Sequence, residues 1–251
     1  MVAEKTKQPL WYQEVVGSRL IAAESIELER FLKTLYGYHL LFLGEGGLTK
    51  LVDSSSISHR ILLDPCAEAD IPGISSLRGD LDVFPLRTDS VDVVVLAHVL
   101  EHVANPHEIL RETQRVLIPE GHIIISGFNP FSCWGIWHAY KKMTGKMPRQ
   151  GKMLSHNRLK DWLTLLNFQI VGGELFYFRP PVTHQGLHQK LGFLEKWGQK
   201  FWPFLAGAYT LHAIKRVVPL TPIRARWRTE PIWQGASEGL PKPTTTTTIE
   251  N

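Results

Sequence analysis

The segment that most restricts the fold is VDVVVL, residues 91–96, which is rich in β-branched residues and apolar at nearly every position. A strand with one buried face alternates apolar and polar side chains, whereas a strand covered on both faces need not alternate. Short apolar runs of the same kind lie at 39–43 (HLLFL), 60–63 and 122–126 (HIIIS). The sequence therefore predicts a sheet that is buried between two layers of helices.

Helical patterns separate these strands. Apolar residues recur near every 3.6 positions within 18–35, which predicts an amphipathic helix. A second helix is expected from Asn105, a capping residue followed by Pro106, to about Leu117, where the turn IPEG follows. A third helix is expected after Ser155, which can also cap. Strands that alternate with helices in this way form a parallel sheet.

The end of the pattern differs, because 168–171, 175–178 and 208–215 read as strands around an insertion. We predict that they add antiparallel strands to one edge of the sheet. The expected fold class is α/β, a doubly wound Rossmann-like sheet that is mostly parallel and has an antiparallel edge hairpin. We divide the chain into a cap, a main domain and an extended, disordered Pro- and Thr-rich tail, which are residues 1–36, 37–218 and 219–251.

Positive charge collects in the second half of the chain. Residues 1–139 carry 11 Lys and Arg against 18 Asp and Glu, whereas residues 140–233 carry 16 against 4. Such an imbalance favours an anionic partner for the basic region, either RNA, an anionic membrane surface or an anionic substrate. A solvated basic surface without a partner explains the same charges.

Polar and glycine residues follow the predicted strands. A glycine turn begins at Gly44, Asp64 ends the second strand, and the segment Gly79 to Asp82 precedes the strand at 91–96. Ligands of open α/β sheets bind at the carboxyl ends of the strands. Glycines let the backbone approach a ligand closely, and an acid after the next strand can accept the two ribose hydroxyls. Together these features predict a nucleoside site.

The run GDLDVFPLRTDSVDVVVLAHVLEHVANPHEILRETQRVLIPEGHIIIS, residues 79–126, resembles the class I S-adenosylmethionine-dependent methyltransferases. Within that family it is most similar to the branch that contains many small-molecule and quinone-ring methylases. A looser resemblance extends from about residue 38 to 216. The resemblance implies S-adenosylmethionine as the cofactor and methyl transfer to a small acceptor.

The resemblance also implies which residues contact the cofactor. The loop from Leu43 to Gly47 would lie beneath the methionine part, Asp64 would hold the ribose hydroxyls, and Asp80 and the Leu81 backbone would meet the adenine. The full set of expected cofactor-binding residues is Leu43, Gly44, Glu45, Gly46, Asp64, Asp80, Leu81, Ala97 and His98. The chain departs from the family pattern at Phe42, where an acid is usual, and at Leu48, where a third glycine is usual. Glu45 could supply the missing carboxylate.

The two long insertions, near 128–154 and 179–207, would build the acceptor pocket. Methyl transfer is an in-line displacement, so a general base is needed only if the acceptor must lose a proton early. The histidines that could serve are His98, His138 and His156. An inactive S-adenosylmethionine-binding protein that acts on RNA or a membrane surface remains an alternative.

The segment HVLEH, residues 98–102, also matches the H-x-x-E-H pattern of zinc hydrolases. It directly follows a buried strand, and a new helix starts at Asn105, which disfavours a zinc-binding helix. We therefore expect no metal, and we expect Glu101 and His102 to orient local backbone. The chain has two cysteines without paired spacing, and its N-terminal segment lacks the apolar region of a signal peptide. These features predict a cytoplasmic protein.

Overall fold

The computed structural model describes residues 15–44, 46–65, 71–144, 153–180, 198 and 202–217. Within them lies a seven-stranded sheet with the strand order β3-β2-β1-β4-β5-β7-β6. The strands are β1 (His39–Leu43), β2 (His59–Leu63), β3 (Ser75–Leu77), β4 (Val91–Ala97), β5 (Leu117–Phe128), β6 (Phe168–Phe176) and β7 (Ala208–Lys215). Strands β1 to β5 pair in parallel, and β7 pairs antiparallel with both β5 and β6. The predicted fold class is confirmed.

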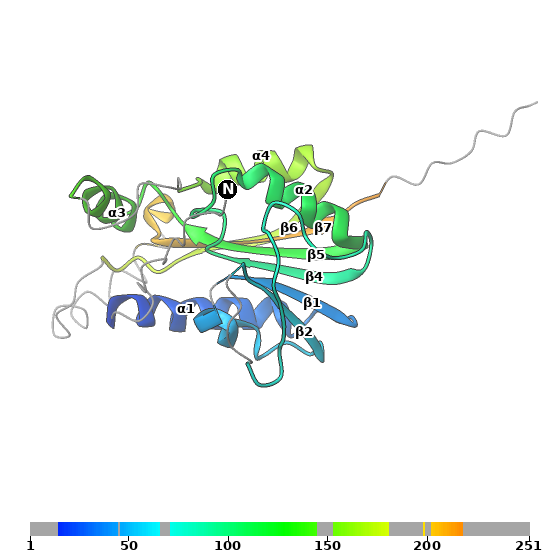
Figure 1. Ribbon diagram of the computed structural model, residues 1–251. Coiled ribbons are helices and arrows are strands. Elements are labelled where there is room, and N and C mark those ends of the chain that lie inside the picture. Colours follow the sequence, from blue (N-terminus) through cyan, green and yellow to red (C-terminus); the bar gives the residue numbers. More distant parts are fainter. Residues whose placement is uncertain are drawn as a thin grey trace, which may run out of the picture. The chain divides into compact units, whose positions relative to one another are not determined.

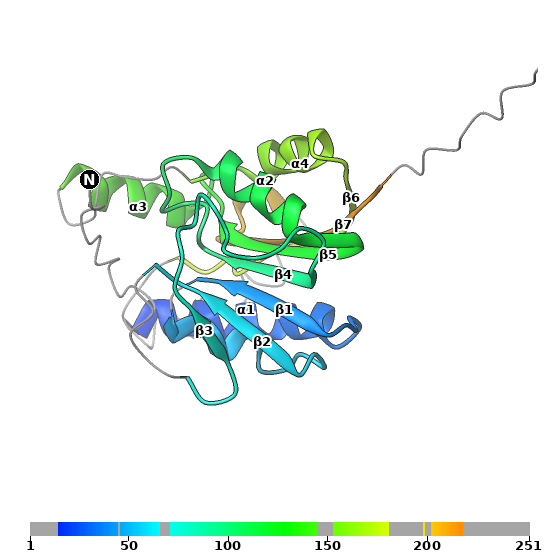
Figure 2. The same ribbon diagram turned by 45° about the vertical axis from the view of Figure 1, so that its right-hand side comes forward.

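Helices cover both faces of the sheet (Figures 1 and 2). One face is covered by α1 (Val15–Leu32) and the short 3-10 helix η2 (Gly46–Val52), and the other by α2 (Pro106–Val116) and α4 (His156–Leu165). Helix α3 (Cys133–Met143) follows the carboxyl end of β5, and the 3-10 helix η3 (Pro203–Leu205) precedes β7. In the described part of the chain, no helix is long and apolar enough to cross a membrane.

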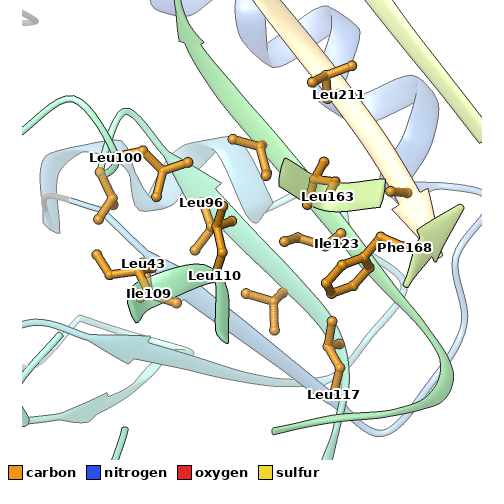
Figure 3. Close-up of a cluster of buried hydrophobic side chains, with 14 of the residues drawn as sticks. Leu43, Leu96, Leu100, Ile109, Leu110, Leu117, Ile123, Leu163, Phe168 and Leu211 are labelled. Atoms are coloured by element: carbon orange, nitrogen blue, oxygen red, sulfur yellow. The ribbon is translucent and has the colours of Figure 1, made fainter. Parts of the chain in front are cut away.

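Alternating side chains of the central strands enter separate cores. On the α2 and α4 side, Leu96 and Ile123 pack with Ile109 and Leu163 (Figure 3). On the other side, Val95 and neighbouring strand residues pack with α1 and η2. The central strands therefore bury both faces, which is why their sequences do not alternate between apolar and polar residues.

Several predicted boundaries were wrong. The turn at IPEG is part of β5, because the pairing register of β5 with β4 shifts at Val91 and the strand takes up the bend as a bulge. Likewise, the separate strands predicted at 168–171 and 175–178 form the single strand β6, whose register shifts between Ile170 and Gly172. Asn105 makes no side-chain capping bond, whereas Ser155 caps α4 by accepting from the Arg158 amide.

The division into cap, main domain and tail stays a prediction. Helix α1, from the predicted cap, packs directly on the sheet. Much of the two insertions, and the tail beyond residue 217, lie outside the described residues.

Candidate functional site

The parallel strands bring most of the predicted cofactor residues to one edge of the sheet. Leu43 pairs with Leu63 of β2 and with Leu96 of β4, and Leu63 in turn pairs with Leu77 of β3. The carboxyl ends of β3, β2, β1 and β4 therefore lie side by side, in the order that these strands have in the sheet. We call this edge, where Gly44, Asp64, Gly79 and Ala97 follow or end their strands, the rim.

Gly44 fits only as glycine. A Cβ atom added there would lie 2.9 Å from Cζ of Phe42 and 3.2 Å from the carbonyl oxygen of Ala97. The turn after β1 thus passes directly against the end of β4, at the point where the strand order reverses. Sheets of this type bind nucleotides at that switch point. Glu45 lies outside the described residues, and Gly46 begins η2.

The two predicted carboxylates occupy neighbouring positions at the rim. Asp64 is half-buried, and its backbone N–H donates to the carbonyl oxygen of Leu77 at 3.2 Å. Asp80 is exposed, and its Oδ1 accepts from the backbone N–H of Asp82 at 3.2 Å. Leu81 is half-buried and packs against the α2-side core. This loop therefore offers carboxylate oxygens and backbone groups beside the glycine turn.

Side chains of helix α2 hold the part of this loop that follows Asp80 in the chain. Nη2 of Arg115 donates to the carbonyl oxygen of Phe84 at 3.0 Å, and Nη1 donates to that of Leu86 at 2.9 Å. Glu112 accepts from the Phe84 amide at 2.9 Å. The hydrogen bond from Arg115 also lowers the pKa of Glu112. The loop that carries Asp80 is thus held by charge-assisted bonds at its far end.

A buried group of three titratable side chains lies at the end of β4. Nε2 of His98 lies 3.0 Å from Oε2 of Glu24, which comes from α1, and Nδ1 lies 3.7 Å from Oε1 of Glu101. All three side chains are almost completely buried. The Glu101 carboxylate also accepts from the backbone N–H of Phe128, so Glu101 orients local backbone as predicted. We call Glu24, His98 and Glu101 the rim triad.

The triad fixes the charge of His98. Burial by itself would lower the pKa of His98, but the charge of Glu24 and the hydrogen bond with Glu101 outweigh burial and raise it to about 10. The ring is therefore an imidazolium at neutral pH, with both nitrogens directed at carboxylates. Such a ring cannot take a proton from an acceptor. His98 was one of the predicted base candidates, and the geometry opposes that role.

Glu24 was missed by the sequence analysis. It stands four residues after Leu20 and four before Leu28, which places it on the buried apolar stripe of α1. An acid at such a position needs a buried partner. The sequence thus held a signal for Glu24, although it could not name His98 as the partner.

Of the other two base candidates, only the side chain of His156 is placed by the structure. The side chain of His138 lies outside the described residues. His156 begins α4, and its ring centroid lies 5.8 Å from that of Tyr209, which belongs to the α2-side core. Burial lowers the pKa of His156.

The residues of HVLEH do not form a helix. His98 directly follows β4 with φ of 54°, the next residues form turns, and the following helix begins at Pro106. The two histidines therefore do not share a helical face, which a zinc hydrolase of this pattern requires. No group of three or more potential metal-binding side chains was found among the residues that the structure describes.

The chemistry of the rim fits S-adenosylmethionine. Gly44 lets the turn after β1 pass close to the end of β4, and Asp64 and Asp80 offer acceptors for hydroxyl and amino groups. The rim triad combines two carboxylates with one imidazolium, so it carries one net negative charge when both acids are ionised. A buried negative charge at the end of β4 suits a sulfonium cation. Buried Phe42 replaces the acid of the family pattern, and the carboxylates of the triad come from other elements.

An aromatic cluster adjoins His98. The ring of Phe128 lies 4.5 Å from the His98 ring between centroids, and Trp134 of α3 stacks on Phe128 at 5.6 Å. Trp134 also meets Tyr177 edge-on at 5.8 Å. The segment after β5 and the segment after β6 therefore meet beside the triad. These are the starts of the two insertions that were predicted to build the acceptor pocket.

The comparisons with known proteins agree with this geometry. A family described as "Methyltransferase domain" matches residues 44–125. The uncharacterized protein YafS of Escherichia coli K12 is 31% identical over 196 residues, which cover 78% of this chain and 75% of YafS. A solved S-adenosylmethionine-dependent methyltransferase of Thermotoga maritima, described as a possible histamine N-methyltransferase, is similar with a TM-score of 0.62. It is 16% identical and covers 82% of this chain and 93% of its own. Another methyltransferase, from Mesorhizobium loti, gives 0.56 at 16% identity over 76% and 97%.

Proposed function

The chain belongs to the class I S-adenosylmethionine-dependent methyltransferases, and we propose that it methylates a small acceptor that carries an aromatic ring. The observation that carries the proposal is the gathering of a glycine turn, two acids and the rim triad along the ends of β1 to β4. The cofactor is S-adenosylmethionine. The non-helical HVLEH segment argues against a zinc hydrolase, and no finding favours an inactive binding protein.

In the proposed site, Asp64 accepts hydrogen bonds from the ribose hydroxyls, and Asp80 and the Leu81 backbone hold the adenine. The loop at Leu43, Gly44 and Gly46 lies beneath the methionine part, together with Glu45. Ala97 and His98 flank the cofactor at the end of β4. These assignments come from the family resemblance, and the shared position of the residues at the rim supports them.

Bound S-adenosylmethionine supplies an electrophilic methyl group on a sulfonium. The protein must hold the acceptor in line with that group and exclude water. The buried triad helps to fix the end of β4, because Nε2 of His98 contacts Glu24 at 3.0 Å and Nδ1 lies 3.7 Å from Glu101. His98 thus acts as a positioning residue. Any proton that the acceptor releases must leave to another group or to solvent.

The aromatic cluster supports the proposed acceptor. Phe128, Trp134 and Tyr177 stand next to the triad, and aromatic walls favour flat, apolar ligands through stacking. The basic charge of residues 140–233 further favours an anionic partner, either an anionic acceptor, RNA or a membrane surface.

Isothermal titration with S-adenosylmethionine tests the cofactor site. Asp64→Ala should weaken binding by about 10- to 100-fold, because a charge-assisted pair of hydrogen bonds is lost. Asp53→Ala is the matched control, since Asp53 is an exposed acid whose carboxylate forms an ion pair with Arg60. Equal affinity of Asp64→Ala and the control would refute the ribose assignment.

Incubation with methyl-labelled cofactor and fractionated cell extract tests the acceptor. We expect label to enter the low-molecular-weight fraction and to be retained there after protein and RNA are removed. If label enters only the RNA or protein fractions, the acceptor is not a small molecule. Binding of the cofactor without transfer to any fraction would instead favour an inactive binding protein.

A further inference from the structure

Helix α3 exposes large apolar side chains along one face. Ile136, Tyr140 and Met143 follow one another at spacings of four and three, and they are 70%, 63% and 87% exposed. Phe131, just before the helix, is 68% exposed, whereas Trp134 on another side of the helix is buried. Helices of globular proteins normally bury their apolar stripe. A second, exposed apolar stripe therefore marks a candidate interaction surface.

The same surface extends to η3 through Asn129. Its Nδ2 donates to the carbonyl oxygen of Phe204 at 2.7 Å, and its Oδ1 accepts from the amide of Phe131 at 3.2 Å. Phe204 is also mostly exposed. We call Phe131, Ile136, Tyr140, Met143 and Phe204 the α3 patch. Because α3 begins five residues after β5 ends, the patch stands at the rim end of the sheet (Figure 1).

The sequence around the patch is strongly basic. The run KKMTGKMPRQGK, residues 141–152, contains five Lys and Arg and no acid. Exposed aromatic and aliphatic side chains beside dense positive charge are typical of helices that lie on anionic membranes. An RNA partner would match the charge but would gain little from the side chains of Ile136 and Met143. The combination therefore favours lipid.

We propose that the α3 patch docks the enzyme on an anionic phospholipid surface. The apolar side chains would enter the boundary between headgroups and acyl chains, while the neighbouring basic residues meet lipid phosphates. The acceptor side of the rim would then face the lipid. The inference refines the anionic partner of the proposed function and rests on it in that respect, but it concerns binding and not methyl transfer.

Sedimentation of the full-length protein with vesicles tests the proposal. We expect binding to phosphatidylcholine vesicles that contain phosphatidylglycerol, and much weaker binding to vesicles of phosphatidylcholine alone or at high salt. The double variant Ile136→Glu, Met143→Glu should bind at least about ten times more weakly, since both side chains would carry charge into the bilayer boundary. The matched control is Ile26→Glu, Leu165→Glu, which changes exposed apolar residues of α1 and α4.

Equal vesicle binding by the patch variant and the control would overturn the proposal. The proposal would also be overturned if light scattering showed that the wild type is a dimer and the patch variant a monomer, and if the wild type did not bind vesicles. A second copy of the chain would then cover the patch. Loss of binding to an RNA oligonucleotide in the patch variant, with no vesicle binding by the wild type, would have the same effect. The affinity for S-adenosylmethionine, measured in each variant, should be unchanged, which separates this proposal from the cofactor site.

Discussion

Two histidine sites on the α1 side of the sheet differ in charge. At the rim, His98 is held between Glu24 and Glu101. Farther from the rim, Nδ1 of His122 on β5 lies 3.0 Å from Nε2 of His212 on β7, and the His212 ring lies 5.4 Å from that of Phe31. Burial and the charge of His122 lower the pKa of His212 to about 4, and burial lowers the pKa of His122.

The comparison shows that carboxylate partners can outweigh burial in setting the charge of a buried ring. His98 is the more buried ring, and burial opposes its charge, yet its two carboxylates keep it protonated. The His212 ring contacts the rings of His122 and Phe31, and burial together with His122 lowers its pKa, so its neutral form is favoured. The His98 ring lies at the rim, and the His122–His212 pair lies beside Phe31, near the C-terminal end of α1.

The largest expected effect comes from removing the buried carboxylate of the triad. Glu24→Ala should lower the free energy of unfolding by about 3–5 kcal/mol, because the buried imidazolium loses its closest counter-charge. Urea unfolding measures the change. The control is Glu27→Ala on the same helix, whose carboxylate forms an ion pair with the exposed Arg30. If the two variants have the same free energy of unfolding, the triad does not stabilise the packing of α1 against β4.

Alkaline pH should weaken the triad without any mutation. The folded-state pKa of His98, about 10, lies above its ordinary value of 6.5. Its contribution is therefore fully present below pH 6.5 and is lost as pH rises toward 10. We expect the stability of the wild type to fall across this window, and the fall to be much smaller in Glu24→Gln. Parallel curves for the two proteins would argue against a charged His98.

Acid pH should act on the other site with the opposite sign. The folded-state pKa of His212 lies below its ordinary value, so its contribution is present above pH 6.5 and is lost as pH falls toward 4. Relative to wild type, His212→Gln should reduce the stability loss between pH 7 and 4.5 by about 1–2 kcal/mol. Urea unfolding at the two pH values checks this. If the loss of stability at acid pH is the same in His212→Gln as in the wild type, other groups control that loss.

Cofactor charge offers a finer test of the triad. Glu24→Gln should weaken the binding of S-adenosylmethionine more than that of S-adenosylhomocysteine, since only S-adenosylmethionine carries a sulfonium charge. The ratio of the two affinities should change by about 3- to 10-fold. Calorimetry with both ligands measures the ratio, and Glu24→Asp should restore it. A purely structural role of Glu24 would lower both affinities equally.

The smallest effect is expected for the outer attachment of α1. Arg30 contacts Glu27 and Glu174 of β6; the side chains of Arg30 and Glu174 are 62% and 45% exposed, and that of Glu27 is 20% exposed. Exposed ion pairs contribute little to stability. Arg30→Ala should therefore leave the melting temperature and its pH dependence unchanged, in contrast to the buried attachment at Glu24. A clear fall would mean that the exposed pair also fastens the helix.

Much of the fold followed from local pattern. Strands such as 91–97 are apolar at almost every position, so their burial on both faces could be predicted, and the order of strands and helices then placed Gly44, Asp64 and Asp80 at one edge. Strand β3 was missed because three residues, two of them serine, give no periodic signal. Helix α3 was missed because its aromatic residues were interpreted as an insertion.

The triad could not be predicted for a different reason. Glu24 and His98 are 74 residues apart, and the pairing depends on where α1 crosses the sheet. Local sequence does not encode that crossing. The charge state of His98, which opposes its predicted role as a base, depends on the same contact.

The separation of Glu24 and His98 also bears on how the protein is made. Helix α1 leaves the ribosome well before β4, and its buried acid has no counter-charge until β4 has joined the sheet. Contacts between distant parts of a chain form slowly, because a long loop must close first. A chain that ends before β4 thus leaves the apolar stripe of α1 uncovered by the sheet and the Glu24 carboxylate without its partner His98.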